Sequence, residues 1–183
     1  MFTDTIESTK IHRTPKVSVK EIGIGDIASK NTLEEMKYYI NNGLTQLIVR
    51  QTVHNILRNI SERSQYDEIK VIFKWVQDHC RYTNDPKGLE CITAPEVMLE
   101  EISKTGLALE DCDSFTILLA TLLKFAGYPV RLKAVGFYKG KQLSHVYLQV
   151  KLGDEWMSAD AIKKDKSLGW ESNNIKRVMY LEV

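Results

Sequence analysis

The sequence predicts an α+β fold, with helices in the first two thirds of the chain and an antiparallel sheet in the last third. Apolar residues recur at helical spacings of three and four between residues 32 and 126. Alternating apolar and polar residues, typical of strands, follow residue 130. Because helices followed by strands indicate α+β proteins, we predict N-terminal helices and a central buried helix packed on an antiparallel β-sheet.

Four helices are predicted before the central one. Thr32-Leu33-Glu34-Glu35 has the form of a capping box, and Gly43 is typical of a helix end. The second helix covers about residues 46–60, the third opens at Ser64, and a short fourth covers residues 94–102. Residues 81–93 have no periodicity, and residues 103–110 are predicted to be a loop.

The central helix is predicted over residues 112–126, where apolar residues are too dense for a surface helix. Gly127 and Pro129 indicate its end. The strands that follow are predicted at residues 130–138, 144–152, 155–161 and 177–183. Gly153-Asp154 is expected to form a two-residue hairpin turn between the second and third of them.

The composition is that of one globular domain, because 43% of the 183 residues are hydrophobic and 27% are charged. We expect a single domain over residues 31–183 and an extended polar arm over residues 1–30. The formal charge of +1 gives no general affinity for nucleic acid or acidic membranes. We find no secretory signal and no apolar stretch long enough for a bilayer. Three sparse cysteines indicate a reducing, cytoplasmic compartment.

Cys112 is the candidate nucleophile among the three cysteines. It lies at the predicted start of the central helix, where unpaired N–H groups and the helix dipole stabilise a thiolate. Cys80 lies at the end of a predicted helix, where the dipole acts in the opposite direction, and Cys91 lies in a loop. The alternative is a buried structural thiol, since free cysteine is among the most buried residue types.

Strand parity brings an imidazole and a carboxylate together. If Gly153-Asp154 is a two-residue turn, Tyr147 lies opposite Asp160. His145 is two positions from Tyr147, so it shares a face with Asp160 as its diagonal neighbour. The apolar face of the strand is the opposite one. His145 must therefore reach Cys112 from the beginning of the strand or through a bulge.

These three residue types support nucleophilic catalysis. His145 would hold Cys112 as a thiolate and later protonate the leaving group, and Asp160 would orient the imidazole. The backbone N–H of Cys112 would stabilise an oxyanion. The sequence does not identify a second oxyanion donor.

Four sequence blocks resemble the transglutaminase-like superfamily: Glu110-Asp111-Cys112-Asp113-Ser114-Phe115, Gly127-Tyr128-Pro129-Val130-Arg131, Ser144-His145-Val146-Tyr147 and Glu155-Trp156-Met157-Ser158-Ala159-Asp160. The resemblance implies a transglutaminase-like, papain-like core with Cys112, His145 and Asp160 as catalytic residues. The superfamily includes cysteine proteases, peptide N-glycanases, protein-crosslinking enzymes and inactive members. Many members have glycine where this chain has Glu110, and an additional carboxylate near the thiol disfavours the thiolate.

The N-terminal region resembles a subgroup encoded by tailed bacteriophages and prophages. The resemblance lies in Gly25-Asp26, followed by Thr32-Leu33 and paired helices. This resemblance implies a protein of the host cytoplasm. Association with the virion and partners among the phage structural proteins are further expectations.

No cofactor and no metal site are predicted. His79-Cys80 and Cys91 offer no CxxC pair for zinc. Asp85, Asp111 and Asp113 lack the spacing of a calcium loop, so they could bind a cation only if folding happened to bring them together.

Two functional hypotheses follow. The first is a thiol-dependent acyl-transfer enzyme that hydrolyses a peptide or side-chain amide through a Cys112 thioester. The second is a non-catalytic phage structural or assembly module that retains the fold. The partner would be a protein or peptide substrate in the first case and a phage structural protein in the second; neither involves nucleic acid or a membrane.

Overall fold

A computed structural model describes residues 18–58, 60, 64–86, 90–140 and 142–183. Its helices are α1 (Gly25–Gly43), α2 (Leu47–Leu57), α3 (Gln65–His79), α4 (Pro95–Thr105) and α5 (Cys112–Phe125). Its strands are β1 (Cys80–Tyr82), β2 (Ala108–Glu110), β3 (Val130–Gly136), β4 (His145–Leu152), β5 (Glu155–Ala159) and β6 (Arg177–Glu182). In the described part of the chain, no helix combines the length and apolar content of a membrane span.

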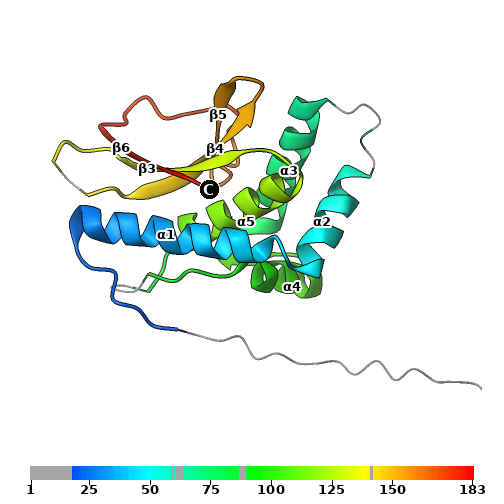
Figure 1. Ribbon diagram of the computed structural model, residues 1–183, viewed down its shortest axis with the longest axis horizontal. Helices are drawn as coiled ribbons and strands as arrows, with labels where there is room; N and C mark the ends of the chain where they lie inside the picture. Colours follow the sequence, from blue (N-terminus) through cyan, green and yellow to red (C-terminus); the bar gives the residue numbers. More distant parts are fainter. Residues whose placement is uncertain (1–17, 59, 61–63, 87–89, 141) are drawn as a thin grey trace, which may run out of the picture.

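The main sheet has the strand order β5-β4-β3-β6, and all its pairings are antiparallel. The helices gather on one side of it (Figure 1). Helix α5 contacts β3, β4 and all four other helices of the described residues, and every residue from Asp113 to Leu123 is buried. The predicted α+β fold with a central buried helix is confirmed.

The β4–β5 hairpin has the predicted register. Leu152 pairs with Glu155 and Leu148 with Ala159, as a two-residue turn requires. The β3–β4 ladder is regular from the Val130–Val150 pair to the Val135–His145 pair. His145 is therefore the first residue of its strand, so it lies at one end of this interior strand and no bulge is needed there.

Helix α1 begins at Gly25, seven residues before the predicted start. Residues 25–30 are therefore helical rather than part of an extended arm, which is a correction; the arm's residues 1–17 lie outside the described residues. Distant residues of the chain contact α1, one pair within the added residues and one further along the helix. Arg177 of β6 donates to both carboxylate oxygens of Asp26 at 2.8 and 2.9 Å, and Lys37 donates to the Glu182 carbonyl at 2.8 Å.

The predicted loop at residues 103–110 is also corrected. Helix α4 continues to Thr105 and ends at Gly106, whose φ of +86° favours glycine. The chain then forms β2, which pairs in parallel with β1 from Cys80–Ala108 to Tyr82–Glu110. Such a short pair, formed by distant segments, has no local sequence pattern. It fixes the approach of the chain to α5.

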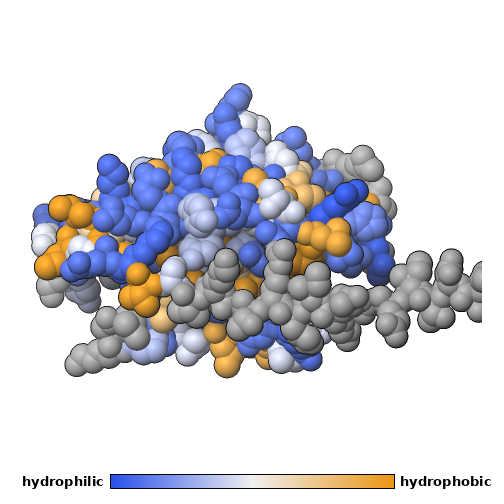
Figure 2. All heavy atoms as spheres, turned by 60° about the horizontal axis from the view of Figure 1, so that its bottom comes forward, coloured by the Kyte–Doolittle hydropathy of each residue, from blue (hydrophilic) through white to orange (hydrophobic). Residues whose placement is uncertain are grey.

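The face of the molecule in Figure 2 is largely hydrophilic. Where it is not drawn in grey, hydrophobic side chains lie in separate patches among hydrophilic ones (Figure 2). Two exposed hydrophobic residues lie at the start of α1. Ile24, just before the helix, is 84% exposed, and Ile27, in its first turn, is 69% exposed.

Gly43 lies where α1 meets α4 and α5. A Cβ there would come within 2.5 Å of Pro95 Cγ and 2.8 Å of Thr121 Cγ2. We expect Gly43→Ala to lower the free energy of unfolding by about 1–3 kcal/mol, because crowding outweighs the gain of about 1 kcal/mol from helix propensity. Urea unfolding would measure the change. Asn42→Ala, at the exposed neighbouring position, is the control, and equal stability of the two variants would contradict the prediction.

Candidate active site

Cys112 is the first residue of α5. The Asp111 carboxylate caps the helix by accepting the Ser114 N–H at 3.3 Å. Thr116 donates its hydroxyl to the Val146 carbonyl at 3.2 Å, which joins the first turn of α5 to the start of β4. The half-buried thiol therefore lies between a helix N-terminus and the strand that begins with His145.

His145 and Asp160 are in direct contact. The distance from His145 Nε2 to Asp160 Oδ2 is 2.8 Å, so the two residues meet as strand parity predicts. The buried Asp160 side chain is fixed further, because its Oδ1 accepts the Ile162 N–H at 3.3 Å. This contact occupies Nε2, which leaves Nδ1 as the imidazole nitrogen for proton exchange with a thiol.

One cleft contains both Cys112 and His145. It has a volume of about 370 Å³, and one wall consists of Cys112, Asp113, His145 and Val146. The opposite wall is formed by the segment before α1 and by the first turns of that helix, residues 22–36. The structure therefore brings the three predicted site residues to one place, with Asp160 behind His145.

A family model described as the transglutaminase-like superfamily matches residues 50–161, more than half of the chain. The match includes Cys112, His145 and Asp160. This protein belongs to the transglutaminase-like superfamily. Its α1, which supplies much of the second cleft wall, lies before the matched region.

Solved structures with a similar fold include two bacterial proteins. A candidate protease from Parabacteroides distasonis has a TM-score of 0.55 and 11% identity, over 71% of this chain and 26% of its own. A candidate cysteine protease from Cytophaga hutchinsonii has a TM-score of 0.49 and 13% identity, over 79% of this chain and 56% of its own. This transglutaminase-like chain thus spans about a quarter and about half of their lengths. No curated protein matches it.

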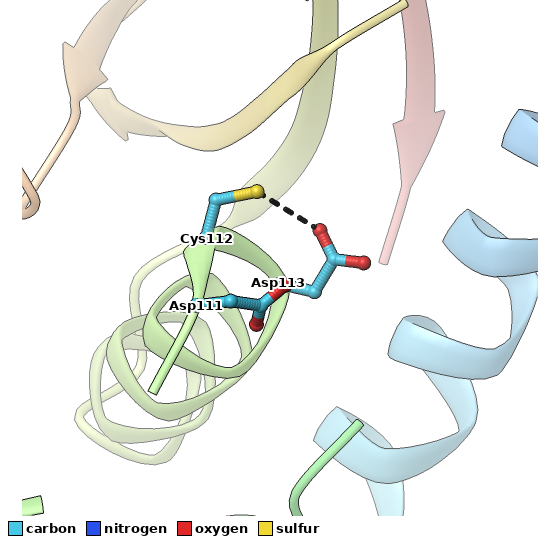
Figure 3. A group of neighbouring side chains, drawn as sticks. All are labelled: Asp111, Cys112 and Asp113. Atoms are coloured by element: carbon cyan, nitrogen blue, oxygen red, sulfur yellow. Dashed lines mark hydrogen bonds between the residues drawn. The ribbon is translucent and has the colours of Figure 1, made fainter. Parts of the chain in front are cut away.

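The surroundings of Cys112 in this transglutaminase-like protein favour the neutral thiol. Burial raises the pKa of Cys112 above its ordinary value, and the negative charges of Asp113 and Asp111 raise it further. The Val146 N–H acts in the opposite direction. The thiol donates to Asp113 Oδ1 at 3.4 Å (Figure 3). In this geometry, Cys112 is therefore a neutral thiol that is hydrogen-bonded to the Asp113 carboxylate.

The carboxylates that disfavour the thiolate differ from the one that the sequence suggests. Glu110 Oε2 accepts the Thr93 hydroxyl at 3.0 Å, whereas Asp113 and Asp111 act on the sulfur. Burial raises the pKa of Asp111 to about 6, and the charges of Asp85 and Glu90 contribute to the rise. Asp113 could have been found from its position beside Cys112, but Glu90 could not, because it lies within the stretch of residues 81–93 that has no periodicity.

The other two thiols have different environments. Cys80 is fully buried, and burial raises its pKa to about 12. Cys91 is exposed, and its backbone N–H donates to the Asp85 carboxylate. These two cysteines provide internal references for the reactivity of Cys112: one protected from solvent and one accessible.

Proposed function

We propose that this protein is a thiol-dependent acyl-transfer enzyme that hydrolyses a peptide or side-chain amide. One observation carries the proposal. His145, which Asp160 holds through a 2.8 Å contact, lines the same cleft as a cysteine at a helix N-terminus. A nucleophile, a base and a group that orients the base are the minimum set for covalent acyl transfer.

The proposed reaction begins with the thiol proton moving from Cys112 Sγ to His145 Nδ1. The sulfur then attacks the carbonyl carbon, and the backbone N–H of Cys112 stabilises the oxyanion that forms. The imidazolium returns its proton to the leaving amine as the C–N bond breaks, which leaves a thioester. Water, deprotonated by His145, hydrolyses the thioester and frees the sulfur. Asp160 stabilises the imidazolium at both stages.

The test is the rate of iodoacetamide alkylation at each cysteine between about pH 5 and 9, followed by mass spectrometry. Because the thiolate reacts, we expect Cys112 to react at neutral pH at least about 10-fold faster in the wild type than in His145→Ala. His54→Ala, an exposed histidine on α2, is the matched control. A Cys112 that reacts no faster than the reference Cys91, with no effect of His145→Ala, would contradict the enzyme proposal.

A second candidate is a non-catalytic structural or assembly module of a tailed phage. The bond from the Cys112 thiol to Asp113, together with the raised pKa, favours this alternative. Its partner would be a phage structural protein in the host cytoplasm or in the virion. A stable complex with such a protein that Cys112→Ala leaves intact would support it, and loss of the complex in that variant would contradict it.

A further inference from the structure

Four carboxylates gather beside Cys112, although they come from different segments. Asp85 follows β1, Glu90 precedes α4, and Asp111 and Asp113 flank the cysteine at the start of α5. Ligand atoms of Asp85, Glu90 and Asp111 all lie within 4.8 Å of one another. Those of Asp111, Cys112 and Asp113 do so as well (Figure 3). Folding thus produces the proximity that the sequence spacing did not predict.

The Asp113 side chain provides an independent observation. It is only 4% exposed, and its Oδ1 accepts the thiol of Cys112. Its Oδ2 is buried, and no N–H or O–H group of the described residues lies within hydrogen-bonding distance. Among the neighbouring groups, the Glu90 carboxyl acts most strongly on the Asp113 carboxyl. A buried carboxylate oxygen without a donor is costly, so this pair needs a positive species between its oxygens.

Two species can satisfy such a pair: a shared proton or a metal ion. Within the described ranges, no lysine, arginine or histidine forms an ion pair with any of the four carboxylates. A shared proton would serve Asp113 and Glu90 but not Asp85 and Asp111. A cation would neutralise all four at once.

We propose that Asp85, Glu90, Asp111 and Asp113 form a binding site for a calcium ion. The donors are carboxylate oxygens, which suit hard cations, and Ca²⁺ accepts irregular arrangements of six to eight oxygens, whereas Mg²⁺ requires a near-ideal octahedron. Asp111 Oδ1 and Asp85 Oδ2 already accept backbone N–H groups, so their other oxygens are the expected ligands. Glu90 is exposed and lines the cleft, which gives the ion a route from solvent.

The soft sulfur of Cys112 lies beside the four carboxylates, but calcium has little affinity for thiols. The proposal therefore leaves Cys112 outside the set of ligands. It also does not depend on whether Cys112 turns over a substrate, so its test is a direct measurement of binding.

The experiment is isothermal titration calorimetry with CaCl₂ on protein first treated with EDTA and dialysed. We expect one site per chain, with the affinity reduced at least about 10-fold in both Glu90→Gln and Asp113→Asn, since each removes one charged ligand. Asp154→Asn, at the β4–β5 turn, is the matched control and should bind as the wild type does. Because Glu90 is exposed, Glu90→Gln should fold even if Asp113→Asn does not.

Thermal unfolding with and without CaCl₂ gives a second readout. Calcium should raise the Tm of the wild type and of Asp154→Asn, but not that of Glu90→Gln. The proposal is overturned if no heat and no Tm shift occur up to about 10 mM CaCl₂, beyond the weak end of known protein sites. It is also overturned if Glu90→Gln binds as tightly as the wild type, or if MgCl₂ binds more tightly than CaCl₂. If CaCl₂ has no effect on the wild type, and Asp113→Asn has a higher Tm than the wild type, a proton shared by Asp113 and Glu90 would explain the contact instead.

Discussion

Asp160→Asn should lower the rate of acyl transfer to Cys112 by about 10²–10⁴-fold, the range for loss of a positioned base. The Asp160 carboxylate accepts a hydrogen bond from the N–H at His145 Nε2, so Nδ1 remains free to accept the thiol proton. In the variant, the Ile162 N–H still requires a carbonyl oxygen at the Oδ1 position. The new amide NH₂ group therefore faces Nε2 and forces the proton onto Nδ1, which can no longer act as a base.

Single-turnover acylation by p-nitrophenyl acetate, observed as release of p-nitrophenolate, measures this effect. Asp165→Asn is the matched control, because Asp165 is an exposed carboxylate on the same loop and pairs only with its neighbour Lys166 among the described residues. Its rate should equal that of the wild type. An Asp160→Asn protein that folds normally and acylates at the wild-type rate would contradict the role of Asp160.

Glu171→Ala should lower the free energy of unfolding by about 3–5 kcal/mol, the cost of leaving a buried charge without its partner. Three donors converge on Glu171 Oε1: Lys133 Nζ at 2.5 Å, the Tyr147 hydroxyl at 2.6 Å and the Ser158 hydroxyl at 2.7 Å. Lys133 is only 4% exposed. Guanidinium chloride unfolding would measure the loss. Lys133→Met/Glu171→Ala is the control, since it removes the unpaired charge and should recover part of the stability.

The same contacts give the protein an acid-sensitive element. Burial acts to raise the pKa of Glu171, but the hydrogen bonds from Lys133, Tyr147 and Ser158 outweigh it and hold the pKa below its ordinary value. A carboxyl whose pKa is lower when folded than when unfolded contributes stability above its unfolded pKa of about 4.3 and loses it as the pH falls through the folded value. Lowering the pH from 6 to below about 4 should therefore reduce the denaturant midpoint of unfolding less in Glu171→Ala than in the wild type. An equal difference in both proteins would contradict this assignment.

The sequence predicts the main sheet and the His145–Asp160 contact for a local reason. The Gly153-Asp154 turn sets the register of β4 and β5, and parity then decides which side chains share a face. The N-terminal position of Cys112 follows from the apolar density of α5 and its Asp111 cap. These features need only neighbouring residues, so a sequence can show them.

Two features could not be predicted from the sequence: the proximity of Asp85 and Glu90 to Asp111, and the cleft wall formed by residues 22–36. Asp85 and Glu90 lie in segments without periodicity, and the parallel β1–β2 pair places the chain beside α5 through contacts between distant segments. The early start of α1 likewise depends on Arg177, which is 151 residues away from Asp26. Tertiary contacts decide such features, and local propensity does not report them.

The links from α1 to β6 have a consequence for the order of events during synthesis. A ribosome adds about 5–20 residues per second, so Arg177 emerges roughly 8–30 s after Asp26, given the 151 residues between them. Until then, neither the Asp26–Arg177 bond nor the Lys37–Glu182 bond can hold α1 in place. Cys112 and His145 are already present during the last part of this interval, while the opposite wall lacks both links. For several seconds of synthesis, α1 is therefore held only by its packing on α5 and α4, without the two links to β6.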